Sequence, residues 1–435
     1  MPIESVVWRQ PAPGKGIVMK LREIRLDGYK NISECRIPIR DFNVVVGPNN
    51  SGKSNLLEVF RTLWGLCFGP SDERLSFFHG KPFNFQDPRS FGLMHPTTKA
   101  LSIGITLETE VEQEPWNVEF DLTVRRSFSK EEGESFGFQR ETLRAKQPSK
   151  TGPARAYLQR DGKTLTIGTK THPIPLDTSV LTALPVLYPE SKGLAPELAT
   201  FLNDILAVAK TTTYALSPEE LRANLDGEMA LWDSRIPGYG VLAALDEIYS
   251  AKDKGKWALF EETLMDILDL DKVLFAVHNQ SIPDPDDKGR EKTRTFRIRT
   301  FLLKRKGGDY ALIEEFSDGT LVVVALVAAL ILQDRTSGPT CIEELENCLH
   351  PMAQEKLLRF LQSNASRWQT IVTTHSPYLV NGVDPDNLLV AVVDEQGYSR
   401  FRKPEDRKAI NDLLKPGFMS LGDLMADNFK DVLKE

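Results

Sequence analysis

The sequence contains few cysteines and histidines, and their scatter argues against a disulfide framework or a structural metal site. The four cysteines, Cys35, Cys67, Cys341 and Cys348, form no Cys-x-x-Cys pair. Isolated thiols of this kind are typical of a cytoplasmic protein, and they lack the spacing of a zinc site. The six histidines are also scattered, without the i, i+4 spacing that a metal site on a helix would need.

The sequence also lacks an apolar run long enough to cross a membrane. Residues 321–332 form an unbroken apolar run of twelve, whereas a membrane-spanning helix needs about 20 residues. The first residues show no charged-then-apolar pattern of a signal peptide. We therefore expect no membrane contact and a cytoplasmic location, and we expect the apolar run to be a buried helix.

The overall composition is that of a globular protein with a sizeable core. Apolar residues make up 41% of the chain and charged residues 26%, and the 435 residues suggest two or three structural units. The net charge of −7 argues against general affinity for nucleic acid. One segment, 140–170, carries eight Lys or Arg against two acidic residues. It is either a solvated hairpin or a contact face for nucleic acid or an acidic partner.

Apolar periodicity predicts the order of the secondary structure along the chain. Alternating apolar residues predict a β-hairpin over 20–39, and the antiparallel pattern continues to about residue 128, ahead of a polar, turn-rich segment at 129–172. Apolar residues spaced three to four positions apart predict helices over 194–271. A second hairpin is predicted over 294–316, with its turn at Gly307-Gly308.

A phosphate-binding loop lies between a short apolar strand and an amphipathic helix, in the stretch FNVVVGPNNSGKSNLLEVF. Gly47 and Gly52 let main-chain N–H groups point inward at phosphate oxygens, and the helix, from about Lys53 to Trp64, adds its positive end. Lys53 would reach the β- and γ-phosphates of ATP, and Ser54 would bind Mg²⁺. The predicted nucleotide-binding residues are Gly47, Asn49, Asn50, Ser51, Gly52, Lys53, Ser54 and Asn55.

Two further motifs supply groups for hydrolysis. A short apolar strand ends in Glu343-Glu344; Glu343 would hold Mg²⁺ through water, and Glu344 would orient and deprotonate the attacking water. A later strand ends at His375, a candidate sensor of the γ-phosphate. The acidic pair Asp394-Glu395 also follows a strand, but the Gly397 and polar residues behind it favour a hairpin turn.

Four stretches, in their order along the chain, resemble the ABC-type ATPase superfamily in its RecF/SMC-like branch. They are the phosphate loop, FSDGT, IEELENCLHP and TTHSP. The resemblance is closest to stand-alone AAA-family ATP-binding proteins and to the ATPase half of OLD-family nucleases. It implies an α/β ATPase head with a mixed central sheet, an antiparallel β-subdomain and an inserted helical lobe. The expected parts are 18–190 and 272–400 for the head, 191–271 for the helical insertion and 401–435 for a helical tail.

The same resemblance implies that a complete site needs two chains. Ser317 and Gly319 of SDGT would form the signature motif, at the start of the apolar helix, and would face the γ-phosphate held by another subunit. We therefore expect an ATP-sandwich homodimer, or a higher assembly built from it. Leu345 stands where the family usually has proline, and Cys348 where a small residue is common.

Gln86 is a candidate for the glutamine that contacts the metal.

The resemblance leaves two biological roles open. The first is an ATPase switch that controls a separate effector, such as a nuclease or toxin partner in an anti-phage defence system. The alternative is a DNA-clamping ATPase of repair or chromosome maintenance, which would use segment 140–170 and Arg294, Arg297 and Arg299. A transporter is disfavoured because about 270 residues separate the phosphate loop from the signature, counted from Gly47 to Ser317. A nuclease domain is disfavoured because about 60 residues follow TTHSP.

Overall fold

The computed structural model describes residues 19–68, 99–129, 133–189, 193–214, 217–223, 225, 240–283, 293–333 and 338–403. The chain forms two compact units. The phosphate-loop unit comprises Met1–Thr212, Arg335–Cys341 and Ala365–Glu435. The helical unit comprises Thr213–Asp334 and Ile342–Asn364. Gln86 and the expected helical tail after residue 403 lie outside the described residues.

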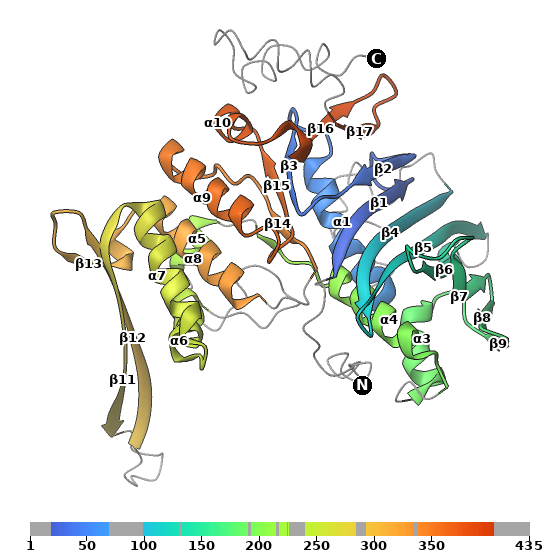
Figure 1. Ribbon diagram of the computed structural model, residues 1–435, viewed down its shortest axis with the longest axis horizontal. Helices are drawn as coiled ribbons and strands as arrows, with labels where there is room; N and C mark the ends of the chain where they lie inside the picture. Colours follow the sequence, from blue (N-terminus) through green and yellow to red (C-terminus); the bar gives the residue numbers. More distant parts are fainter. Residues whose placement is uncertain are drawn as a thin grey trace. The chain divides into compact units, whose positions relative to one another are not determined.

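The phosphate-loop unit contains an antiparallel sheet of eight strands, in the order β2-β1-β4-β5-β6-β7-β8-β9 (Figure 1). The alternating pattern over 20–39 is confirmed as a β1–β2 hairpin, with Ile24 opposite Ile37. The polar segment 129–172 also pairs into this sheet, because Leu143, Leu158 and Leu165 point into the core while most of the polar residues described there face solvent. The strands are β1 (Lys20–Asp27), β2 (Cys35–Pro38), β4 (Ala100–Val111), β5 (Glu114–Ser129), β6 (Gly133–Lys146), β7 (Arg155–Asp161), β8 (Thr164–Ile167) and β9 (Lys170–Pro173).

The same unit holds five strands of a mixed sheet, in the order β14-β15-β3-β16-β17. Strand β3 pairs in parallel with both β15 and β16, and all five of its residues are buried. A parallel strand covered on both faces is apolar along its length, as Val44, Val45 and Val46 are, and the buried Asn43 amide donates to the main-chain carbonyls of Arg40 and Thr370. The strands are β3 (Phe42–Val46), β14 (Thr340–Ile342), β15 (Thr370–Thr374), β16 (Leu388–Val393) and β17 (Ser399–Arg402).

Three helices share the core of this unit with its strands: α1 (Lys53–Phe68), α3 (Val180–Leu187) and α4 (Pro196–Ala209). Helix α1 is one turn longer than the sequence predicted, because Leu66, Cys67 and Phe68 at its end are also buried. The short helices α10 (Pro377–Asn381) and η4 (Pro385–Asn387) connect β15 to β16.

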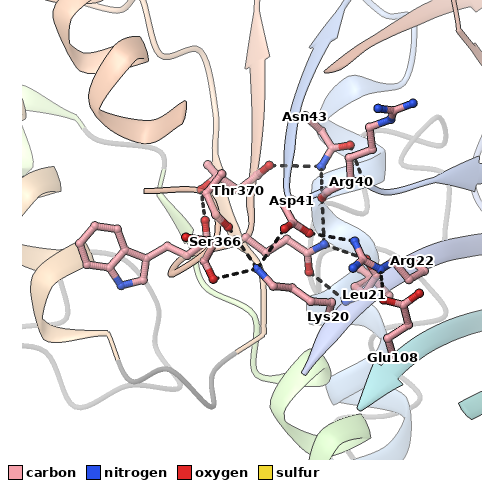
Figure 2. Close-up of polar contacts among 12 residues, drawn as sticks. Lys20, Leu21, Arg22, Arg40, Asp41, Asn43, Glu108, Ser366 and Thr370 are labelled. Carbon is pink, nitrogen blue, oxygen red and sulfur yellow. Dashed lines mark hydrogen bonds and ion pairs between the residues drawn. The ribbon is translucent and has the colours of Figure 1, made fainter. Parts of the chain in front are cut away.

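A polar network ties β1 to the residues around the start of β3 and β15 (Figure 2). The Lys20 ammonium donates to two main-chain carbonyls just before β15, at 3.1 Å each, and lies 3.6 Å from Asp41. Asp41 also accepts from Arg22 at 2.8 Å. The Gln369 side chain exchanges hydrogen bonds with the main chain of Leu21, at 2.9 and 2.7 Å. The network therefore fixes β1 at the amino ends of β3 and β15, opposite the end that leads into the phosphate loop.

A fully buried ion pair joins β6, β7 and the start of α3. Arg160 donates to Glu141 at 2.8 Å, and neither side chain has any exposed surface. Glu141 also accepts from the Ser179 hydroxyl at 2.6 Å and from the Val180 N–H. Burial raises the pKa of the Glu141 carboxyl, against these hydrogen bonds and the nearby guanidinium, which lower it. Arg160, one of the eight basic residues of segment 140–170, is therefore not available to a partner.

The helical unit surrounds α8, which contains the apolar run. Residues 321–331 are all buried, and α8 packs against α5, α6 and α7. The expectation of a buried helix is confirmed, and no helix in the described ranges is both long and apolar enough to cross a membrane. The helices are α5 (Pro218–Ala223), α6 (Val241–Ser250), α7 (Lys254–Leu268), α8 (Asp318–Leu332) and α9 (Pro351–Ser363), with η3 (Ile313–Glu315) before α8.

A long hairpin of β11 (Leu270–Pro283) and β12 (Thr293–Arg305), extended by β13 (Tyr310–Leu312), lies beside α6 and α7 (Figure 1). The predicted turn at Gly307-Gly308 is confirmed between β12 and β13. Asp246 of α6 accepts from Arg297 at 2.5 Å and from Arg299 at 3.2 Å. Hydrogen bonding to these guanidinium groups lowers the pKa of Asp246 to about 2, so both arginines are engaged within the unit. Strand β10 (Thr213–Tyr214) also belongs to this unit.

Candidate nucleotide-binding site

The predicted phosphate loop connects β3 directly to α1. Strand β3 ends at Val46 and α1 begins at Lys53, so residues 47–52 make the turn between them. Asn50 and Gly52 have φ angles of 64° and 91°, in the left-handed region. Asn tolerates this conformation better than most residues, and Gly adopts it without strain. Successive turns of this kind direct main-chain N–H groups into one concave surface, which is how such loops hold phosphates.

Both glycines of the loop are also required by close packing. A Cβ atom on Gly47 would lie 2.3 Å from the carbonyl oxygen of Ala391 in β16. A Cβ atom on Gly52 would lie 2.4 Å from the Ser399 hydroxyl in β17. Neither position can hold a larger residue unless a neighbouring strand moves.

Lys53 closes the loop from the first turn of α1. Its side chain is buried, and its ammonium donates to the carbonyls of Gly47 at 2.8 Å and Pro48 at 2.9 Å. No acidic residue lies in the first turn of α1. The ammonium and the positive end of the helix therefore make this concave surface suited to an anion.

The remaining loop residues divide into exposed and buried groups. Asn49, Asn50 and Ser54 are exposed at the loop surface, where a nucleotide could reach them. The Ser51 hydroxyl is fully buried and has no hydrogen-bond partner in the described part of the chain. A buried polar atom without a partner is costly, and a bound phosphate oxygen would be a suitable one.

Asn55 braces the loop from behind. Its amide donates to Asn31 Oδ1 at 2.6 Å and accepts from the Lys30 ammonium at 3.1 Å. Asn31 in turn donates to the Ser399 hydroxyl at 2.7 Å, and its carbonyl accepts from the Ser399 N–H at 2.7 Å. Because Ser399 packs against Gly52, this Asn31–Ser399 brace fixes the back of the phosphate loop. Asn31 and Ser399 carry no motif of their own, so the sequence alone did not predict their role.

His375 lies at the same edge of the mixed sheet as the phosphate loop. Strands β15 and β3 are parallel, and Thr374 is in register with Val46. The next residues, His375 and Gly47, therefore leave the sheet side by side, and the His375 side chain is exposed. A residue predicted from a separate motif is thus brought to the loop by strand pairing.

Glu343 and Glu344 follow β14, within the helical unit. The Glu343 N–H donates to the Tyr214 carbonyl at 2.9 Å. Glu344 has a φ of 49°, and its carboxylate accepts from the Asn347 amide at 2.8 Å. A non-glycine residue in this conformation costs roughly 1 kcal/mol or more, and such strain is concentrated at functional positions.

The predicted signature residues lie at the start of α8. Ser317 is the N-cap and accepts from the Thr320 N–H at 3.4 Å. A Cβ atom on Gly319 would lie 2.3 Å from the carbonyl oxygen of Cys348, in the loop that follows Glu344. This contact explains why position 319 requires glycine, and it joins two of the predicted motifs within the helical unit.

The acidic pair Asp394-Glu395, which also follows a strand, is explained by its local geometry. Asp394 lies in the turn between β16 and β17, where its carboxylate accepts from the N–H groups of Gln396 and Tyr398 and from Arg400. The prediction that this acidic pair forms a hairpin turn is confirmed. Among the described residues, no group of three or more His, Cys, Asp or Glu is arranged to hold a metal ion without other ligands.

A cavity of about 480 Å³ lies in the phosphate-loop unit beside Trp116 and Tyr157. Lys150 lies 6.0 Å from the Trp116 ring centroid, and Arg155 lies 4.7 Å from that of Tyr157. The Tyr157 hydroxyl donates to Glu197 at 3.0 Å. Burial raises the pKa of Tyr157 to about 12, so it stays protonated. Part of the basic segment 140–170 therefore gathers beside a half-buried Trp116 and a buried Tyr157.

Two protein-family models match parts of the chain. A family model described as an AAA ATPase domain matches residues 19–137. A second, described as an AAA domain, putative AbiEii toxin, Type IV TA system, matches residues 198–381. No curated protein matches the chain.

Several solved structures also match. An SMC head domain from Thermotoga maritima is 14% identical with a TM-score of 0.42, covering 89% of this chain and 100% of that one. An SMC head domain with an extended coiled coil, bound to the C-terminal domain of ScpA and derived from Pyrococcus furiosus, is 14% identical with a TM-score of 0.45. It covers 92% of this chain and 100% of that chain.

Proposed function

We propose that this chain, an ABC/SMC-like P-loop ATPase, hydrolyses ATP as a switch that controls a separate effector protein. The observation that carries the proposal is the geometry between β3 and α1. There the two tightly packed glycines, the left-handed turns and the Lys53 ammonium form a concave anion site at the edge where His375 also leaves the sheet. The family matches support the same activity.

The proposed reaction is attack of water on the γ-phosphorus of ATP. Glu344 accepts the water proton while the bond from the γ-phosphorus to the β,γ-bridging oxygen breaks, which releases ADP and phosphate. Lys53 and the loop N–H groups stabilise the growing negative charge, and His375 contacts the γ-phosphate. Ser54 and Glu343 offer the oxygen ligands that Mg²⁺ prefers, and the bound ion would neutralise charge on the β- and γ-phosphates.

We further propose that two chains complete each site. One chain supplies the phosphate loop, Glu344 and His375, and its partner supplies Ser317 and Gly319 at the positive end of α8. ATP would then hold a homodimer together, and hydrolysis would release it, which makes the cycle a two-state switch.

The effector is proposed to be a nuclease or toxin in an anti-phage defence system. The description of the family matched at 198–381, which names a putative toxin and a Type IV toxin–antitoxin system, supports this choice. Asp246 offsets one of the two positive charges of Arg297 and Arg299, and Arg160 is fully buried, so less positive charge is available to a DNA clamp than the sequence suggests.

DNA clamping is kept as the alternative because of the cavity at Trp116. Aromatic surface flanked by Lys146, Lys150 and Arg155 is suited to a stacked base and its phosphates. Salt-sensitive DNA binding that is lost in Lys150→Ala would favour this alternative.

The decisive experiment measures the mass in solution of Glu344→Gln, with and without Mg·ATP. This variant should bind ATP but not hydrolyse it, so the 48.9 kDa chain should double in mass only when ATP is present. The Lys53→Ala protein should not respond. A mass that is independent of ATP in the Glu344→Gln protein would contradict the switch, and unchanged hydrolysis in Lys53→Ala would contradict the site itself.

A further inference from the structure

We infer that Arg222 is a positioning residue that sets the signature segment, residues 314–318, for contact with the nucleotide of a partner chain. The inference rests on the proposed function, because it assigns a role to the start of α8 in the two-chain site. Arg222 lies on α5, 96 residues before Asp318, and carries no recognisable motif.

The guanidinium of Arg222 makes three hydrogen bonds to this short segment. It donates to the main-chain carbonyls of Glu314 at 3.0 Å and Phe316 at 2.7 Å, and to the Asp318 carboxylate at 2.7 Å. On the same segment, the Arg305 guanidinium lies 4.5 Å from the ring centroid of Phe316. The chain leading into α8 is thus fixed by side chains from α5 and β12.

Local capping alone holds the start of α8 weakly. The Ser317 hydroxyl accepts from the Thr320 N–H at 3.4 Å, which is long for a hydrogen bond, and shares one neutral hydrogen bond with the Thr320 hydroxyl at 3.1 Å. The Arg222 contacts to Phe316 and Asp318 are shorter and charge-assisted, and such bonds are roughly twice as strong as neutral ones. Loss of Arg222 should therefore loosen the segment that presents Ser317.

Arg222 also neutralises a negative charge at the amino end of α8. Asp318 is the acidic residue in the first turn of α8, where a negative charge would repel an incoming phosphate. Pairing with Arg222 neutralises that charge. Both side chains are partly exposed, at 36% and 52%, so the pair itself contributes little to folding stability. The pair's larger effect is on binding of the partner chain's γ-phosphate to the start of α8.

The test compares Arg222→Ala with Arg359→Ala, both in the full chain. Arg359 also pairs with a carboxylate in the helical unit, Glu355, and is a matched surface control. In Arg222→Ala, ATP binding by the chain's own phosphate loop should stay within about twofold of the wild type, while ATP-dependent dimerisation and hydrolysis fall by about tenfold. Arg359→Ala should change neither.

A rescue experiment separates positioning of the anion site from a general structural role. Adding Asp318→Asn to Arg222→Ala removes the carboxylate that is no longer neutralised, so ATP-dependent dimerisation should partly recover. A merely structural lesion would not be rescued by removing a further hydrogen-bond partner. Asp318→Asn alone should dimerise at least as well as the wild type. The Asp318→Asn variant also tests the inference if Arg222→Ala does not fold. Weakened dimerisation in Asp318→Asn would overturn the inference.

Mixing two inactive variants tests whether Arg222 acts in the partner's site. In a dimer of one Arg222→Ala chain and one Lys53→Ala chain, one site carries both lesions and the other carries none, so hydrolysis should reappear. A mixture of Lys53→Ala and Glu344→Gln should stay inactive. Each chain supplies both residues to one site, so each of the two sites in the mixed dimer would carry one lesion.

Three results would overturn the inference. They are wild-type dimerisation in Arg222→Ala, a loss of ATP binding by the Arg222→Ala chain itself, and no recovery of hydrolysis in the mixture with Lys53→Ala. If Lys53→Ala and Glu344→Gln both behave like the wild type, the proposed function fails instead, which is a distinguishable outcome.

Discussion

The packing of Ser399 against Gly52 predicts a specific and measurable cost for Gly52→Ala. Alanine at φ 91° costs about 1–2 kcal/mol in backbone strain. Its Cβ atom would also lie 2.4 Å from the Ser399 hydroxyl, which is fully buried and held by Asn31. Moving Ser399 would break that hydrogen bond, at a further cost of about 1 kcal/mol.

If the empty loop relaxes to avoid this strain, ATP must restore the strained form when it binds. The total of about 2–3 kcal/mol then weakens ATP binding roughly 30- to 140-fold. Titration of a fluorescent ATP analogue measures this directly. Ser399→Gly in the Gly52→Ala background removes the overlap but not the strain, so it should recover about fivefold in affinity relative to the same change in the wild type.

Gly152→Ala is the matched control for backbone strain. Gly152 has a φ of 104°, but a Cβ atom there would meet nothing within 4 Å. It should lower the free energy of unfolding by a similar amount, about 1–2 kcal/mol, and leave ATP affinity unchanged. The reasoning fails if Gly52→Ala binds ATP like the wild type, or if Ser399→Gly gives no recovery.

Three further predictions follow from contacts elsewhere in the chain. Gly47→Ala should abolish ATP binding, because its Cβ atom would overlap a main-chain carbonyl that cannot rotate away; the same titration measures it. Arg160→Met should destabilise the protein by about 3–5 kcal/mol in urea unfolding, because the buried Glu141 would lose its cation. The carboxyl of Asp246 has its pKa lowered from 3.8 to about 2, so its pairing with Arg297 should stabilise the fold above pH 4 and be lost as the pH falls towards 2. Hydrogen exchange of α6 measures that loss.

Each of these predictions has its own control. Gly308→Ala meets only ordinary contacts, at 3.6 Å, and should leave ATP binding intact. The double variant Glu141→Leu with Arg160→Met should be more stable than Arg160→Met, because no charge stays buried; equal stability would contradict the argument. Asp246→Asn should remove the acid-dependent change in exchange of α6.

The sequence by itself determined those features whose cause is local. Gly47, Gly52 and Lys53 lie within one turn of chain, so the phosphate loop was predictable together with the strand before it and the helix after it. The unbroken apolar run likewise predicted a buried α8, because no face of that helix could remain in water. The hairpins followed from two-residue alternation and from turn residues such as Gly307.

Tertiary structure decided the features that depend on residues far apart in the chain. Parallel pairing of β15 with β3 brings His375 beside Gly47, and the brace between Asn31 and Ser399 joins residues 368 positions apart. Packing also determined which charges are available, since Asp246 engages arginines that the sequence left open as DNA contacts. Periodicity and propensity describe each segment alone. Which segments meet is set by the burial of whole faces, and that burial depends on the entire chain.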